Sequence, residues 1–304
     1  MLATTIVNNT PTNYYVYTEK GGFRPLSGST AGGTNTPSNR LSQGGYVAGS
    51  QNKIALPGED FQFIHSDPTK RISLLGVNAT GLVAGGYNGK PAFQRLNQDP
   101  QVVGSINGCF SSLNNKGQAI GKYTPAGTTT QRQCMWTEGK GFTYFATSEE
   151  MTNPILADSG WIAGTWYDSS QFGSQAAVWR PGKGLQSIHM PGADNSYPLD
   201  MNSQGLVVGN VDIARPGDHT PFIWSETTGM LNLRERFINP RSGAHYIWAS
   251  SISESGSILI YSDEKRSGAS DYGYYYLATP VPEPSSWVLI VGMFGLGRFQ
   301  KRQR

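Results

Sequence analysis

A short glycine pattern returns six times along the chain, and it constrains the fold more than any other feature. Its loose form is Asn-x-x-Gly-x-Val-x-Gly, and the first glycine falls at 45, 81, 117, 160, 205 and 256. The copies are SQGGYVAG (42–49), NATGLVAG (78–85), NNKGQAIG (114–121), ADSGWIAG (157–164), NSQGLVVG (202–209) and the degenerate SESGSILI (253–260). The spacings are 36, 36, 43, 45 and 51 residues. Self-similarity at such a period predicts a repeat architecture.

The local chemistry of one copy predicts a turn that enters a strand. Asn and Gly both accept positive φ, so Asn-x-x-Gly favours a tight turn. The next residues alternate between apolar and small side chains, which is typical of a half-buried strand. The closing glycine of the copy either bends this strand or lets another backbone approach it closely.

A second element, an aromatic strand often followed by a glycine turn, comes after each copy. The clear cases are CMWTEGKGF (134–142), AVWRPGKGL (177–185) and FIWSETTGM (222–230), and the weaker ones are FQFIHS (61–66), PAFQRL (91–96) and YYYLAT (274–279). The glycine turns favour hairpins. Trp136, Trp179 and Trp224 hold the same place in three units, so we expect them in equivalent buried positions.

Together these elements give three or four short antiparallel strands per unit, which is the content of a propeller blade. The 38 glycines and the low charged fraction of 15% also suit short strands and turns better than long charged helices. The sequence therefore predicts an all-β fold, a β-propeller of six or seven blades, with one short C-terminal apolar helix. Residues 1–280 form the propeller, with units starting near 40, 76, 112, 155, 200 and 251 and a half-unit at 15–26. Residues 281–304 form a separate tail.

The units resemble HAF repeats, which are named for a His-Ala-Phe strand. The matching strands here read PFIW, AAVW and QCMW, without the histidine. The glycine pattern of that family covers roughly residues 14–279. The resemblance implies an extracellular β-propeller, and it implies a location more than an activity.

The tail has three parts in a fixed order. Val281, Pro282, Glu283 and Pro284 come first, and the prolines oppose continuation of a helix or strand. An uncharged run follows: Trp287, Val288, Leu289, Ile290, Val291, Gly292, Met293, Phe294, Gly295, Leu296 and Gly297. The basic residues Arg298, Lys301, Arg302 and Arg304 close the chain. A basic cluster on the cytoplasmic side would leave the body beyond the membrane. The run is shorter than the roughly 20 residues of a comfortable span.

The sequence VPEPSSWVLIVGMFGLGRFQKRQR resembles the PEP-CTERM sorting signal of Gram-negative bacteria. That resemblance implies processing by an exosortase, tethering in the inner membrane during sorting, and release to the cell surface or beyond. It also implies a cell that makes exopolysaccharide, so biofilm association is expected. We expect cleavage near Pro282–Pro284.

The start of the chain does not show the matching export signal. Residues 1–10 contain no Lys or Arg and only a weak apolar stretch. The half-unit at 15–26 likewise has no visible first half. We therefore expect further sequence upstream of Met1, although the half-unit can instead complete the last blade.

Charge and chemistry narrow the function classes. Residues 281–304 carry the whole net charge of +3, so the body is neutral and offers no electrostatic footprint for nucleic acid. Cys109 and Cys134 can pair in an oxidising compartment, or can be two small buried hydrophobes.

No catalytic motif, metal-ligand spacing or cofactor fingerprint is present in the sequence. The four histidines, His65, His189, His219 and His245, have no ligand spacing, and we expect surface or hydrogen-bonded roles for them. Asp200-Met-Asn202 resembles a calcium loop but lacks the downstream acid, which favours a turn. The adjacent pairs Glu59–Asp60 and Glu149–Glu150 would face opposite ways in a strand.

Three readings of function follow. The favoured one is a non-enzymatic surface or matrix protein, without metal or cofactor, that contacts exopolysaccharide. The alternatives are a propeller enzyme acting on glycans through convergent acids and a lectin-like module with an aromatic shelf. Loop aromatics such as Tyr167, Phe172 and Tyr197 can stack on sugars, although packing between layers explains them more simply.

Overall fold

A computed structural model of the chain describes residues 14–18, 22–26, 42, 45–49, 52–167, 173–213, 219–238, 245–264, 272–281 and 288–292. The chain divides into two compact units, Leu2–Ile162 and Ala163–Arg304. Regular structure in the described residues is almost entirely β, and the three helices are short 3₁₀ turns. The all-β prediction is confirmed.

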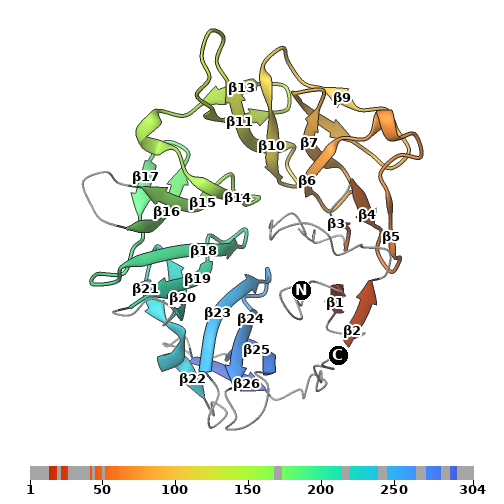
Figure 1. Cartoon of the computed structure of the whole chain (residues 1–304). Helices are drawn as coiled ribbons and strands as arrows, with labels where there is room; N and C mark the ends of the chain where they lie inside the picture. The colour runs from red at the N-terminus through yellow and green to blue at the C-terminus, as the bar shows by residue number, and fades with distance from the viewer. Residues whose placement is uncertain are drawn as a thin grey trace. The chain divides into compact units, whose positions relative to one another are not determined.

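The strands form successive sheets that follow chain order (Figure 1), and their pairs are antiparallel except for the parallel pair β22–β26. The first is the hairpin β1 (Tyr14–Thr18) with β2 (Gly22–Leu26). A three-stranded sheet holds β3 (Val47–Ala48), β4 (Lys53–Ala55) and β5 (Phe61–Phe63). The next holds β6 (Ser73–Val77), β7 (Val83–Tyr87), β8 (Lys90–Gln94) and β9 (Gln101–Val102). It is followed by β10 (Asn107–Leu113), β11 (Gln118–Thr124), β12 (Arg132–Thr137) and β13 (Gly141–Tyr144).

Three more sheets complete the described strands. One holds β14 (Thr152–Leu156), β15 (Ile162–Tyr167), β16 (Ser174–Arg180) and β17 (Gly184–Ser187). Another holds β18 (Asn195–Met201), β19 (Val207–Asp212), β20 (His219–Ser225) and β21 (Gly229–Asn232). The last has the order β22 (Phe237–Ile238), β26 (Val288–Gly292), β25 (Tyr272–Val281), β24 (Ile258–Glu264) and β23 (His245–Ile252). The 3₁₀ turns are η1 (Pro68–Lys70), η2 (Thr147–Glu149) and η3 (Leu233–Arg236).

Neighbouring sheets within each unit pack face to face through apolar side chains. Ile54 on β4 shares a buried cluster with Leu74 and Val83 of the next sheet. Val208 on β19 likewise packs with Ile260 on β24. Among the described residues, six sheets of three to five strands follow one another, as the blades of a six-bladed β-propeller do. This succession agrees with the prediction of a propeller.

In the four sheets of four strands, the repeated glycine pattern forms the hairpin turn between the first and second strands; the last copy forms the turn between β23 and β24, and the turn of the first copy precedes β3. Gly81, Gly117, Gly160, Gly205 and Gly256 all have φ between 70° and 82°, where glycine is favoured. In the four-stranded sheets the first strand precedes the turn, so β10 begins at Asn107, whereas the sequence predicts a unit that starts near 112. The sequence pattern therefore marks the turn of a blade and not its beginning.

The closing glycine of the pattern lies where a neighbouring backbone approaches. A Cβ built on Gly85, Gly121 or Gly209 would lie 1.8–2.0 Å from a carbonyl oxygen of the preceding strand. The pairing register of that strand shifts close by, for example between Pro198 and Asp200. Of the two roles predicted for this glycine, close approach is the one observed.

The three repeat tryptophans occupy equivalent register positions. Trp136, Trp179 and Trp224 pair with Phe142, Leu185 and Met230 on the fourth strand of their sheets. Trp224 is buried, while Trp136 and Trp179 are half-buried. Their equivalence is confirmed, and full burial holds for Trp224.

The prediction of a C-terminal apolar helix is wrong for Val288–Gly292, which forms strand β26 against β25, with Val281 paired to Val288. Val288, Ile290 and Val291 are β-branched and favour extended backbone, and β25 offers an edge that the strand completes. Pro282–Pro284, Trp287 and residues 293–304, including the basic cluster, lie outside the described residues. Within the described part, no helix combines the length and apolarity that crossing a membrane requires.

The possible disulfide between Cys109 and Cys134 is not formed, and both are free thiols. Cys109 lies on β10 and Cys134 on β12, with β11 between them. Strands two apart are separated by about 10 Å, which exceeds the reach of a disulfide. The alternative interpretation is two small buried hydrophobes: Cys134 is buried, and Cys109 is half-buried.

Candidate functional site

A polar and aromatic cluster lies on two successive sheets of the second unit. Asn195, Asp212 and His219 stand in one cross-strand row on β18, β19 and β20. Asp212 ends β19 and His219 begins β20, so the connection between these strands separates them in sequence while the register joins them in space. Asn210, Trp248 and Tyr261 complete the cluster, which we call the Trp248 shelf.

The centre of the Trp248 shelf is a histidine–carboxylate pair. His219 Nδ1 lies 2.5 Å from Asp212 Oδ1, so the proton is assigned to Nδ1 and points at the carboxylate. Asn195 Nδ2 donates to the other oxygen, Oδ2, at 3.3 Å. Asp212 is 13% exposed and His219 28% exposed, which leaves one edge of the imidazole accessible. Its Nε2 has no hydrogen-bond partner within the described part of the chain, so it is available as an acceptor.

Further hydrogen bonds fix the backbone of His219 and the side chain of Asn195. Arg234 Nη2 donates to the carbonyl oxygen of His219 at 2.6 Å, and the backbone N–H of Ser174 donates to Asn195 Oδ1 at 2.8 Å. Asn210 Nδ2 lies 3.4 Å from His219 Nδ1. The polar groups of the shelf are therefore positioned by regular strands and their neighbours, and this rigidity suits a binding surface.

The aromatic part of the shelf comes from the following sheet. Trp248 on β23 is 39% exposed, and its ring stacks on Tyr261 at a centroid distance of 5.2 Å and an interplanar angle of 20°. The His219 ring lies 6.0 Å from that of Trp248. An indole fixed from behind and open to solvent presents a flat apolar surface beside hydrogen-bonding groups.

This combination matches the chemistry of a sugar ring. A pyranose has an apolar C–H face that packs on an aromatic ring. Its hydroxyls donate and accept hydrogen bonds at the rim, where a carboxylate, an imidazole nitrogen and amides can meet them. The shelf supplies one carboxylate, Asp212, and that carboxylate is already engaged by His219 and Asn195.

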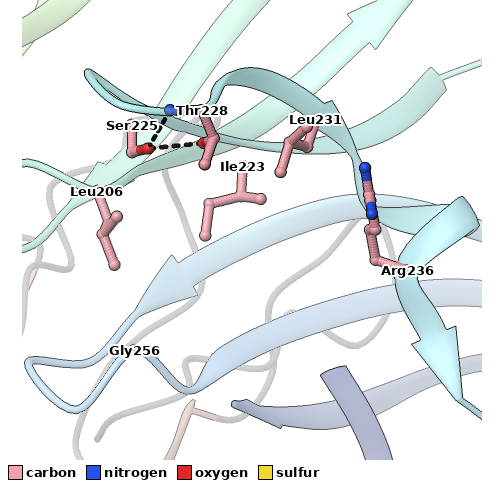
Figure 2. Close-up of a pocket in the computed structure, with 7 residues that line it drawn as sticks. All are labelled: Leu206, Ile223, Ser225, Thr228, Leu231, Arg236 and Gly256. Atoms are coloured by element: carbon pink, nitrogen blue, oxygen red, sulfur yellow. Dashed lines mark hydrogen bonds between the residues drawn. The ribbon is translucent and has the colours of Figure 1, made fainter. Parts of the chain in front are cut away.

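A pocket in the same unit is lined by other residues (Figure 2). It has about 420 Å³ of space, open solvent included, and its lining is Leu206, Ile223, Ser225, Thr228, Leu231, Arg236 and Gly256. Ser225 Oγ accepts from Thr228 N at 3.1 Å and bonds Thr228 Oγ1 at 2.6 Å. The hydroxyls thus satisfy each other, and among the described residues of the lining Arg236 is the single ionisable group. The described lining therefore contains no acid–base pair.

The other histidines have the hydrogen-bonded roles that we expected, as far as the structure describes them. His65 Nδ1 accepts from Asp67 N at 2.9 Å. His189 bonds Ser196 Oγ and the carbonyl oxygen of Ala193. The side chain of His245 lies outside the described residues. His219 departs from this pattern because it joins the shelf.

The remaining candidate residues are mostly structural. Asp200 accepts the backbone N–H groups of Met201 and Ile252 at 2.8 and 2.9 Å, which fits the predicted turn better than a calcium loop. Tyr167 is 69% exposed, Tyr197 is half-buried in β18, and Phe172 lies outside the described residues. Within the described residues, no group of three or more His, Cys, Asp and Glu side chains is placed to hold a metal ion.

Sequence reasoning missed Trp248 and Tyr261. The available signal was the placing of Asp212 and His219 at the two ends of one strand connection. That signal could not reveal that Trp248, from the next sheet, lies beside His219. Neither a protein-family model nor a curated protein matches the chain.

Proposed function

We propose that the protein is an exported, non-enzymatic surface or matrix protein that contacts exopolysaccharide through the Trp248 shelf. The observation that carries the proposal is the exposed Trp248 ring, backed by Tyr261 and bordered by the His219–Asp212 pair. A binding role is favoured because the shelf offers a stacking surface and hydrogen-bonding groups, whereas hydrolysis of a glycan usually needs two carboxyl groups facing each other.

Export and display are proposed from the tail. Strand β25 ends at Val281, so Pro282, Glu283 and Pro284 follow that strand directly in the sequence. Cleavage there by an exosortase-type enzyme would release the body from the apolar run and the basic cluster. Because Val288–Gly292 pairs with β25, engagement of the membrane requires this strand to leave the sheet.

Binding is tested by electrophoresis of the purified protein through gels that contain dextran, galactomannan or alginate. The proposal expects retardation by at least one polysaccharide, and it expects Trp248→Ala to weaken the retardation about tenfold because one stacked ring is lost. Leu199→Ala is the matched control, since Leu199 is 42% exposed but lies outside the shelf. Equal retardation of the wild type and Trp248→Ala would remove the shelf from the proposal.

Processing is tested by mass spectrometry of the mature protein in its native host. The expected product ends near Pro282–Pro284 and is found at the cell surface or in the medium. A mature product that retains Arg304 would leave only a simple anchor, and a protein confined to the cytoplasm would overturn the sorting proposal.

A glycan hydrolase or lyase is the second candidate, and the His219–Asp212 pair is the observation that favours it. An imidazole held by a carboxylate is a general-base arrangement. Release of new reducing ends or unsaturated sugars from the retarding polysaccharide, abolished by His219→Gln, would support this candidate over the binding role.

A further inference from the structure

A second aromatic surface lies in the first unit, at the equivalent end of its own sheet. Tyr123 lies near the end of β11, and Arg132 begins β12, just as Asp212 and His219 flank the connection between β19 and β20. Tyr144, on β13, is 50% exposed. We call Tyr123, Arg132, Tyr144 and Glu150 the Tyr144 shelf.

The side chains of this shelf emerge on one face of the sheet. Tyr123 pairs with Arg132 in the register of β11 and β12, and Tyr144 pairs with Cys134, two residues further along β12. Residues i and i+2 of a strand share a face, so the two tyrosines and Arg132 lie on the same side. The rings of Tyr123 and Tyr144 are 4.6 Å apart.

A column of aromatic rings supports Tyr144 from the core. Tyr144 stacks on Phe142 at 6.2 Å with an interplanar angle of 12°. Phe142 stacks in turn on Phe110, which is fully buried and lies 4.9 Å from Phe93. The exposed ring is therefore fixed before any ligand arrives, and binding loses little side-chain entropy.

An ion pair borders the rings and supplies polar groups. Arg132 Nε lies 2.5 Å from Glu150 Oε1, with side-chain exposures of 30% and 22%. Arg132 Nη2 also donates to the carbonyl oxygen of Phe145 at 3.2 Å, which ties the guanidinium to the residue after Tyr144. A guanidinium donor beside a carboxylate acceptor can bond two neighbouring hydroxyls of one sugar, since each hydroxyl both donates and accepts.

We propose that the Tyr144 shelf is a second saccharide site, which binds a neutral pyranose by stacking on Tyr144 and by hydroxyl contacts to Arg132 and Glu150. The proposal rests on the proposed function, since it assigns the same ligand class to a second place. A chain with two such sites holds two segments of polysaccharide at once, and bivalent attachment strengthens binding to a polymer without any new contact.

Titration calorimetry with a hexasaccharide cut from the retarding polysaccharide tests this proposal. The full chain is expected to bind two molecules, Tyr144→Ala and Trp248→Ala one each, and the double variant none. Tyr144→Phe should bind as the wild type does, because the ring is kept. Glu150→Gln should weaken one of the two sites about tenfold, because a charged acceptor is replaced by a neutral amide.

Phe63→Ala is the matched control in the same unit. Phe63 is 43% exposed, but Arg71 covers its ring at 3.7 Å from the centroid, so the ring is not open to a sugar. Circular dichroism and melting of each variant show that it is folded before its stoichiometry is compared.

The outcomes separate the two proposals. One bound molecule in the wild type, lost in Trp248→Ala and unchanged in Tyr144→Ala, would overturn the second site and leave the proposed function standing. One bound molecule lost only in Tyr144→Ala would support the Tyr144 shelf and remove the Trp248 shelf. Binding of no polysaccharide or hexasaccharide by the wild type would overturn both.

Discussion

The side-chain amide of Asn202 donates to the carbonyl oxygen of Ser253 at 3.1 Å, and this bond joins the glycine turns of two successive repeats. Asn114 makes the same bond to the carbonyl of Ala157 at 3.0 Å. In both repeats the side-chain oxygen of the asparagine accepts two backbone N–H groups of its own turn. The first residue of the pattern thus shapes one turn and attaches it to the next.

The next residue of the pattern adds a second link between repeats. The backbone N–H of Ala79 donates to Asn115 Oδ1, and that of Asn115 donates to Asp158 Oδ1. The backbone N–H of Ser203 donates to the carboxylate of Glu254 at 3.1 Å. Within each unit, therefore, neighbouring turns are joined by a backbone donor and a side-chain acceptor.

Asn202→Ala should destabilise the protein by about 1–3 kcal/mol, because buried backbone N–H groups and the Ser253 carbonyl lose a partner. Asn202→Ser should cost less, about 1 kcal/mol, since Ser42 and Ser253 show that a hydroxyl can accept within this turn. Urea unfolding curves measure both. Equal losses for the two variants would contradict the role of the side-chain acceptor within the turn.

Gly209→Ala should destabilise the protein by about 3 kcal/mol or more, because the new Cβ would lie 2.0 Å from the carbonyl oxygen of Tyr197 and a backbone cannot rotate away. Gly182→Ala is the control, with φ of 75° and nothing within 4 Å of the added carbon. It should cost about 1 kcal/mol from left-handed backbone alone. Thermal melts compare the two, and a smaller loss for Gly209→Ala would reject the close approach.

Cys134 should resist thiol reagents in the folded protein at pH 8. Burial, with a smaller contribution from Cys109, raises the pKa of the Cys134 thiol to about 12, so the reactive thiolate is about one part in ten thousand. Burial also raises the pKa of the Cys109 thiol, so this thiol should react slowly with the same reagents. Labelling of Cys109→Ala and Cys134→Ala, before and after unfolding, assigns each thiol. A native mass two hydrogens below that of the reduced chain would reveal a disulfide and contradict the free thiols.

Acid should remove a stabilising contribution from Glu226. Lys183 Nζ donates to its carboxylate at 2.9 Å, and Arg180 Nη1 lies 2.5 Å from the same oxygen; both cations hold the pKa of Glu226 below its ordinary value of 4.5. Because the folded-state pKa is lowered, the contribution is complete above the unfolded-state value and is lost as pH falls through the folded-state value.

Glu226→Gln should therefore have a lower free energy of unfolding than the wild type at pH 7. The difference between the two free energies should narrow as pH falls from about 4.5. Added salt should also reduce this difference in unfolding free energy, because the ion pairs of Glu226 are partly exposed and salt screens them. Glu138→Gln is the control, since Glu138 has no ion pair among the described residues. A difference that persists unchanged at low pH would point to packing instead of charge.

The sequence by itself determined the all-β class and the repeated turn. The Asn-x-x-Gly turn can be predicted from local sequence, since the positive φ of the glycine and the hydrogen bonds accepted by the asparagine side chain involve only a few neighbouring residues. Gly81 and Gly205 have the positive φ that this turn predicts. The alternation after each turn and the place of Trp224 before a hairpin likewise follow from strand geometry, which has a fixed period.

Only the tertiary structure decided where the candidate sites lie and what becomes of the apolar segment near the C-terminus. Trp248 and His219 come from different sheets, so no local pattern predicts their meeting, and the pairing of Arg132 with Glu150 also depends on how the chain returns after β13. The residues Val288–Gly292 are apolar enough for either a helix or a strand, and the open edge of β25 selects the strand. Short apolar runs fit both forms, and the choice between them is made by the partners that the rest of the chain provides.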